Sequence, residues 1–174
     1  MKNTYINIYE SMLDIKMRQL RVDLKSVENK IRNSYLERNM IESSMYISEL
    51  INGNRKFFIE FISEEIKEIK TLENEMNRRY KVKEVAQLEK LLYEYIYKEL
   101  DTRLKIVDDF NKSCGLNMNI DCEEVWLDIS RRINTNFKVL KLRNKSIKLK
   151  IETKLSIIAI VVSIVAIFVS AIFK

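Results

Sequence analysis

Glycine and proline, the residues that most often interrupt helices and form turns, are almost absent from this chain. Its 174 residues include no proline and two glycines, Gly53 and Gly115. Folds made of many short strands, or of strands alternating with helices, need frequent turns that these residues supply. With 47% hydrophobic residues the chain is also too apolar to be disordered. The sequence therefore predicts an all-α protein with long helices.

The net charge of +6 is concentrated in one short segment. Residues 138–154 alone carry a net charge of +6, and acidic and basic residues balance over the remainder. The basic residues of this segment are Lys138, Lys141, Arg143, Lys145, Lys148, Lys150 and Lys154. We expect them to lie on anionic lipid headgroups, where each cation contributes about 1 kcal/mol. The alternative is that they only set membrane topology, and the balanced charge elsewhere argues against a nucleic-acid partner.

A run of nineteen uncharged residues, 155–173, follows the basic segment. As a helix it is about 28 Å long, which matches the hydrocarbon core of a bilayer. We expect a transmembrane helix, because a buried core helix of this length rarely stays apolar on every face. Positive charge marks the cytoplasmic side, and charged residues near the N-terminus exclude a signal peptide. The prediction is a tail-anchored, single-pass membrane protein whose residues 1–154 are cytosolic.

Small residues recur along one face of the predicted transmembrane helix. They are spaced three and four residues apart and comprise Ser156, Ala159, Ser163, Ala166 and Ser170. Inside a bilayer, helices associate where small side chains let backbones approach and hydroxyls bond across the contact. We expect this Ser/Ala stripe to mediate self-association and, with enough subunits, to line a pore.

The cytosolic part is expected to begin with a helix over residues 4–51. Its apolar seam alternates spacings of four and three residues and comprises Leu13, Met17, Leu20, Leu24, Val27 and Ile31. Such a seam packs against a partner helix, either in another chain or in a bundle formed by one chain. The seam loses phase near residues 33–39, where we expect a bend or a break. Asn52-Gly53-Asn54 is expected to end the helix, because Gly and Asn tolerate the left-handed conformation.

Two further helices are expected, over residues 55–111, with a kink near 78–83, and over 121–154. Asp121 and Glu124 have the spacing of a capping box at the start of the last helix. Its apolar seam comprises Trp126, Ile129, Ile133, Phe137 and Leu140. No helix breaker follows, so this helix is expected to continue into the membrane. The predicted fold is an elongated three-helix bundle or coiled coil with up-down-up topology.

Catalytic chemistry finds little support in the sequence. There is no histidine, and two glycines cannot build a phosphate-binding loop. Two cysteines make neither a zinc site nor a disulfide framework. The segment from Arg131 to Asn136 resembles half of the Arg-x4-His ribonuclease motif of HEPN domains, but Asn136 replaces the histidine. We therefore expect no enzyme activity, no metal and no cofactor.

Two classes of function fit these features. In the first, the chain self-assembles through its coiled-coil seams and its Ser/Ala stripe and permeabilises a membrane, as effectors of antiviral defence or lysis do. In the alternative, it is a membrane-anchored adaptor or scaffold that recruits a cytosolic partner protein. Subunit number separates the two, since a dimer cannot enclose a pore.

Overall fold

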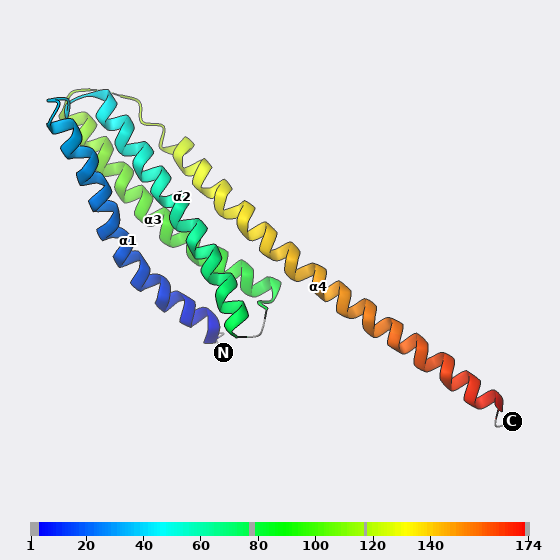
Figure 1. Cartoon of the computed structure of the whole chain (residues 1–174). Coiled ribbons are helices and arrows are strands. Elements are labelled where there is room, and N and C mark those ends of the chain that lie inside the picture. Colours follow the sequence, from blue (N-terminus) through cyan, green and yellow to red (C-terminus); the bar gives the residue numbers. More distant parts are fainter. Residues whose placement is uncertain (1–3, 77–78, 117, 173–174) are drawn as a thin grey trace.

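The computed structural model describes residues 4–76, 79–116 and 118–172, with side-chain surroundings except at 4–5, 145–154, 157 and 161–172. These residues form four helices and no strand: α1 (Thr4–Leu36), α2 (Ser44–Glu75), α3 (Val82–Ser113) and α4 (Cys122–Ile172). The all-α prediction is confirmed. Successive helices run in opposite directions, and the second half of α4 extends beyond the others (Figure 1).

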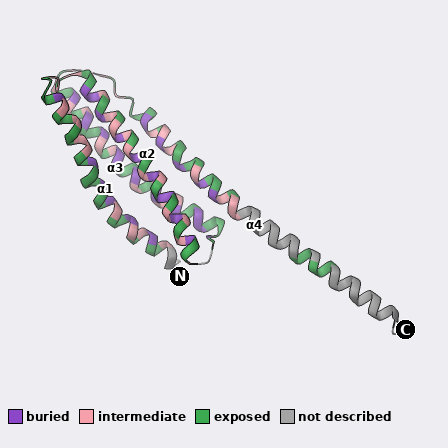
Figure 2. Cartoon of the chain, viewed as in Figure 1, coloured by how far each residue is buried: buried purple, intermediate pink, exposed green. Residues whose placement is uncertain are grey.

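The core of the bundle is a column of apolar side chains contributed by all four helices. α1 and α4 each pack against both α2 and α3, and over the described residues they do not pack against each other. Each helix of the bundle carries buried residues that alternate with exposed ones (Figure 2). Ile129, Ile133, Phe137 and Leu140 of α4 are buried, as their spacing predicts. Leu140 is the last residue of α4 in this core.

The predicted break near residues 33–39 is confirmed. α1 ends at Leu36, and Asn39 adopts a left-handed backbone conformation with φ of 54°. Asparagine tolerates this conformation better than most residues, which explains where the chain turns. Ser43 then caps α2, because its hydroxyl accepts a hydrogen bond from the Tyr46 backbone amide at 3.2 Å.

The predicted helix end at Asn52-Gly53-Asn54 is wrong, because α2 runs through all three residues. Gly53 faces α1: a Cβ atom there would lie 2.7 Å from Ile31 Cδ1. Asn54 is buried within the bundle. The glycine therefore permits a close approach of two helices, a role that sequence spacing alone does not distinguish from helix termination.

The single helix predicted over 55–111 is also corrected. α2 ends at Glu75 and α3 begins at Val82, so the expected kink is a complete break. A continuous helix would place the apolar faces of its two halves end to end, whereas the break folds them against each other. The bundle therefore has four helices rather than three, in up-down-up-down order.

The connection between α3 and α4 agrees with the sequence. α3 ends at Ser113, and Gly115 follows with φ of 66°. Asp121 accepts a hydrogen bond from the Glu124 backbone amide at 2.8 Å, which confirms its capping role. α4 then continues for 51 residues without a break, a length of about 75 Å.

Candidate functional site

Ion pairs fasten the first half of α4 to the bundle at two levels. Arg55 of α2 pairs with Asp128, near the start of α4. Glu89 of α3 pairs with Lys141, thirteen residues further along α4. Such partly exposed pairs contribute little stability but fix the register of one helix against another. They hold α4 parallel to α2 along the length of the bundle.

A buried carboxylate lies where α4 leaves the bundle. The Glu73 side chain of α2 is only 2% exposed and pairs with Arg143 of α4. Glu73 also accepts hydrogen bonds from the Tyr80 amide at 3.0 Å and from Asn144 Nδ2 at 3.3 Å. Asn144 Nδ2 donates to the Tyr80 carbonyl at 2.8 Å as well. This exit network joins α2, the turn before α3, and α4.

Two residues of the basic segment are engaged in ion pairs with α2 and α3. Lys141 forms an ion pair with Glu89 and Arg143 forms one with Glu73, both within the bundle. Lys138 is exposed on the outside of α4. The remaining basic residues of the segment lie outside the described side chains: Lys145, Lys148, Lys150 and Lys154.

The side chains of the predicted transmembrane segment are described only at its start. Leu155, Ile158 and Ile160 are each more than half exposed. Ser156 and Ala159 of the Ser/Ala stripe are also exposed, and the other members lie outside the described side chains: Ser163, Ala166 and Ser170. Among the described residues, no helix has a stretch long and apolar enough to cross a membrane.

The apolar seam of α1 lies inside the chain's own core. Leu13, Met17, Leu20 and Leu24 are at most 2% exposed, packed against the other helices of the same chain. Val27 and Ile31 are half-buried. The seam therefore closes the bundle, which is the second of the two roles its spacing allows.

Two further buried carboxylates brace α1, and sequence reasoning missed both. Glu65 of α2 accepts hydrogen bonds from Tyr9 at 3.1 Å and from Lys16 at 2.8 Å. Burial, together with the negative charge of Glu65, raises the pKa of the Tyr9 hydroxyl well above its usual range. Glu99 of α3 accepts from Arg21 Nε at 2.7 Å. Each carboxylate is buried and satisfied, so these contacts favour one helix register.

The spacing of the sequence does indicate one buried carboxylate, Glu73 of the exit network. Glu73 follows Ile62, Ile66 and Ile69 at the same alternation of four and three residues that marks the apolar face of α2. A charged residue at such a position must be paired when it is buried. Glu65 and Glu99 each lie one position beside this kind of seam, where spacing does not separate buried from exposed carboxylates.

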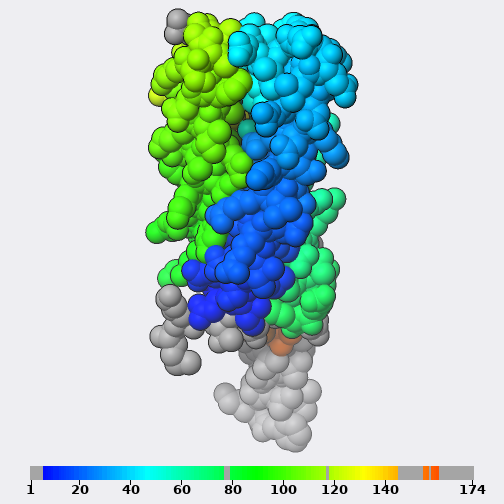
Figure 3. All heavy atoms as spheres, turned by 90° about the vertical axis from the view of Figure 1, so that its left-hand side faces the viewer, coloured from blue at the N-terminus to red at the C-terminus, as the bar shows by residue number. Residues whose placement is uncertain are grey.

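A groove with a volume of about 510 Å³ lies between α1 and α2. We call it the acidic groove. Its lining includes Asp23, Phe57, Glu60, Phe61, Glu64 and Glu68. Figure 3 looks onto α1, with α2 along one edge and α3 along the other. The groove combines a half-buried aromatic floor with carboxylates at its rim.

A smaller pocket of about 270 Å³ lies between α3 and the first turns of α4. Trp126 forms part of its wall and is held edge-on by Tyr93 and Tyr97, with ring centroids 4.8 and 4.7 Å away. Cys122 also lines it. Burial and the neighbouring carboxylates, Asp108 first among them, raise the pKa of the Cys122 thiol. The thiol is thus held protonated, which disfavours nucleophilic chemistry.

Among the described residues, no group of three or more Cys, Asp or Glu side chains is placed to hold a metal ion. Cys114 and Cys122 are both free thiols. Comparison with known proteins gives no match to any family model, to any curated protein or to any solved structure.

Proposed function

We propose that this chain is a tail-anchored membrane protein that holds a four-helix bundle at the cytosolic face of a membrane and assembles with copies of itself. The single observation that carries the proposal is the uncharged run of nineteen residues, 155–173, at the end of the long helix α4. Because the helix is continuous from the bundle to Ile172, membrane and bundle would be joined by a stiff connection.

The basic residues between the bundle and this run support the proposed orientation. Lys145, Lys148, Lys150 and Lys154 follow the exit network and precede Leu155. Lysine side chains beside an apolar helix favour the cytoplasmic side and attract anionic lipid. Since Lys141 and Arg143 hold α4 on the bundle, the lipid-facing part of the basic segment is proposed to begin after Asn144.

The proposed self-assembly uses the membrane stripe rather than the α1 seam. The α1 seam is buried in the core of a single chain, so it does not provide an interface for a second copy. The stripe of Ser156, Ser163 and Ser170 with alanines between them offers close packing and hydroxyl groups in the membrane. Several copies packed through this stripe would surround a polar path, and permeabilisation of a cell's membrane, as in antiviral defence or lysis, is the activity we propose for them.

A membrane-anchored adaptor is the second candidate. It is favoured by the closure of the bundle inside a single chain, which leaves the acidic groove open to a cytosolic partner protein. In this case the Ser/Ala stripe would only pair two anchors, and no leakage would accompany assembly.

The anchor is tested by floating the full chain with liposomes on a density gradient. The chain should float and should resist alkaline extraction. Ile160→Lys with Ile164→Lys should abolish flotation, because each lysine at the centre of a membrane helix costs about 3 kcal/mol. Ile160→Leu with Ile164→Leu is the matched control and should float. Full-length chain that stays at the bottom of the gradient would contradict the anchor.

Permeabilisation is tested by dye leakage from the same liposomes. Ser163→Leu should block leakage, because it fills the stripe with a bulky apolar group. Ser163→Ala should preserve assembly, since one interhelical hydroxyl bond is worth only about 0.6 kcal/mol, but should reduce conduction. Val161→Leu, on the opposite face, is the control and should leak like the unmodified chain. A floating chain that never leaks favours the adaptor.

A further inference from the structure

The acidic groove carries more negative charge than the bundle neutralises. Five carboxylates line it, and its one lysine, Lys16, pairs with the buried Glu65 at 2.8 Å. Glu60 and Glu64 are exposed on successive turns of α2, and no described residue forms an ion pair with either. With Asp23 on the α1 side, carboxylates face each other across the groove.

The floor of the groove is apolar. Phe57 and Phe61 of α2 are half-buried, and Leu20 of α1 also lines the groove. An aromatic floor with an acidic rim suits a helix that carries both aliphatic and basic side chains.

The outer face of α4 has this composition. It comprises Leu127, Ser130, Arg131, Asn134, Thr135 and Lys138, which line a shallow depression on the helix surface. Leu127 is 54% exposed, and the Arg131 side chain is 67% exposed. Arg131 pairs with Asp128 of α4 at 3.6 Å, and the sequence contains no acidic residue from 129 to 151 that could neutralise the rest of this basic face.

The two surfaces lie at the same height on the bundle. Arg55–Asp128 and Glu73–Arg143 align α4 beside α2, and between these levels Arg132 Nη2 lies 3.4 Å from Ser63 Oγ. Arg131 is therefore level with Glu64, the centre of the groove on α2. If two copies stood side by side in the same orientation, the basic face of one copy and the groove of the other would lie at the same level.

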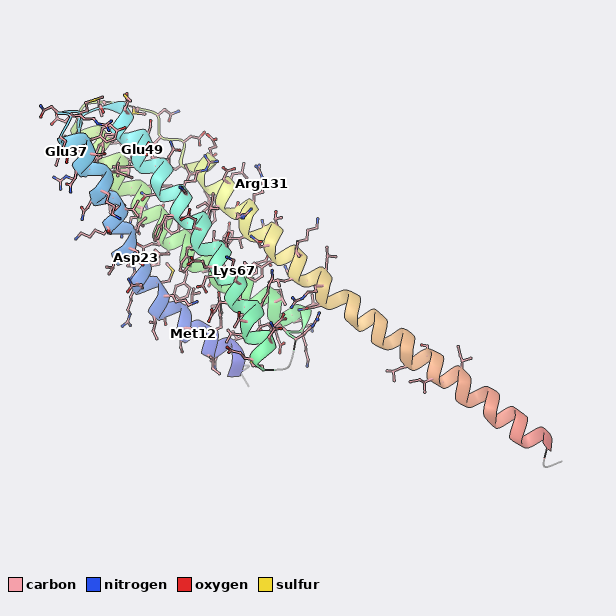
Figure 4. The ribbon with its side chains drawn as sticks, in the orientation of Figure 1. Met12, Asp23, Glu37, Glu49, Lys67 and Arg131 are labelled. Atoms are coloured by element: carbon pink, nitrogen blue, oxygen red, sulfur yellow. The ribbon has the colours of Figure 1, made fainter. Side chains whose placement is uncertain are left out.

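The two surfaces also point to different sides of the molecule. α1, which forms one wall of the groove, does not pack against α4 over the described residues. Figure 4 shows Asp23 on α1 and Arg131 on α4 at opposite sides of the bundle. One chain can thus offer its groove to one neighbour and its basic face to another.

We propose that the basic face of α4 docks into the acidic groove of a second copy of this chain, head to tail. Such a heterologous contact leaves a groove open at one end of the assembly and a basic face open at the other, and it closes only in a ring. Because the two surfaces lie at the same height along the bundle, α4 would leave every copy on the same side of the assembly. The inference rests on the self-assembly in the proposed function and adds the surfaces that bring bundles together.

Paired charge reversals test this contact in the full chain, in detergent micelles or nanodiscs. Glu60→Lys with Glu64→Lys removes the net negative charge of the groove and places two cations at its rim, and Arg131→Glu with Lys138→Glu makes the α4 face acidic. Each variant alone should lose assembly, with a dissociation constant at least about a hundredfold higher, because like charges then meet. Glu37→Lys with Glu42→Lys carries the same charge change at the far end of the bundle and should assemble normally.

Mixing the two reversed variants is the decisive step. The groove with lysines at its rim then receives the acidic α4 face of the other variant, and the remaining groove and face are both unmodified. An equimolar mixture should therefore recover assembly to within about threefold of the unmodified chain, by sedimentation velocity, and high salt should weaken both. Variants that assemble normally when alone, or a mixture that stays dissociated although each variant keeps its helical circular dichroism, would overturn the proposal.

Flotation of the same samples separates this inference from the membrane anchor. Chain that floats, but whose assembly ignores both reversals, overturns the contact and leaves the anchor standing. Assembly that follows the charge pattern in a chain that does not float supports the contact and contradicts the anchor. If Arg131→Glu with Lys138→Glu reduces liposome binding and leaves assembly intact, the basic face serves lipid and the contact is overturned.

Discussion

Ile31 of α1 packs directly against Gly53 of α2. A Cβ atom added at position 53 would lie 2.7 Å from Ile31 Cδ1, which is too close for ordinary van der Waals contact. The glycine sits inside a helix, where it is less favourable than alanine by about 1 kcal/mol. The contact with Ile31 explains why glycine is nevertheless suited to this position. It also suggests a test in which the two residues are changed together.

We expect Gly53→Ala to stabilise the bundle by about 1 kcal/mol when Ile31→Val is already present, because valine lacks the Cδ1 atom that conflicts with the new methyl group. In the unmodified chain the gain should be smaller, since Ile31 must move. Urea unfolding of the four members of this double-mutant cycle measures the coupling. Equal gains with isoleucine and with valine at position 31 would show that the contact imposes no constraint.

Leu24 tests whether the α1 seam belongs to one chain. Its side chain is fully buried, so Leu24→Ala should lower the free energy of unfolding by about 2–5 kcal/mol. Because the seam packs within the chain, this loss should not depend on protein concentration, and assembly of the folded fraction should persist. A loss that shrinks as the concentration rises would place the seam between chains instead.

Glu73 tests the exit network. Glu73→Ala removes the partner of Arg143 and the acceptor of the Tyr80 amide, and should destabilise the bundle by about 2–4 kcal/mol. Amide hydrogen exchange around Arg143 should accelerate as α4 loosens at its exit. Glu75→Ala, an exposed carboxylate two residues on, is the control and should change stability by less than about 0.5 kcal/mol. Similar effects of the two substitutions would remove the special role of Glu73.

The environment of Tyr95 predicts that the free energy of unfolding depends on pH in the alkaline range. Its hydroxyl donates a hydrogen bond to Asp14 at 2.5 Å, which raises the pKa of Tyr95 to about 12. The folded state holds this proton more tightly than the unfolded state, whose pKa is near 10. The resulting stability is therefore complete below pH 10 and is lost as the pH rises toward 12.

Tyr95→Phe should accordingly be less stable than the unmodified chain at pH 8, by about 1 kcal/mol for the lost hydrogen bond. The difference between the two proteins should shrink steadily from pH 10 to pH 12. Comparing their unfolding midpoints at each pH cancels the titration of the lysines. A difference that stays constant across this range would contradict the hydrogen bond to Asp14.

The helical class, the α4 seam, the break near Asn39 and the cap at Asp121 were all predictable from local patterns. Each depends on residues close in sequence, such as Asp121 and the Glu124 amide it binds. The number of helices was not predictable in this way. Gly53 lies between two asparagines, a pattern typical of the end of a helix. Its actual position inside α2 reflects the close contact with Ile31 of α1, which the local pattern does not contain.

The candidate surfaces were harder to predict than the helices. The basic segment was evident as a run of lysines, but its division into bundle-facing and outer residues depends on Glu73 and Glu89, which lie more than fifty residues away. The acidic groove joins Asp23 of α1 to Glu60 and Glu64 of α2, and no short motif connects them. The Ser/Ala stripe beyond Ala159 remains a prediction from sequence.

The mass of the full chain assembled in lipid nanodiscs tests the central claim most directly. A self-assembling membrane protein should insert into the nanodisc and give a native mass of more than two copies of the 20.8 kDa chain. More than two copies are needed because a dimer does not enclose a pore and a head-to-tail contact does not close in a pair of parallel bundles. A chain that inserts only as a monomer, at every protein-to-lipid ratio, would contradict the account.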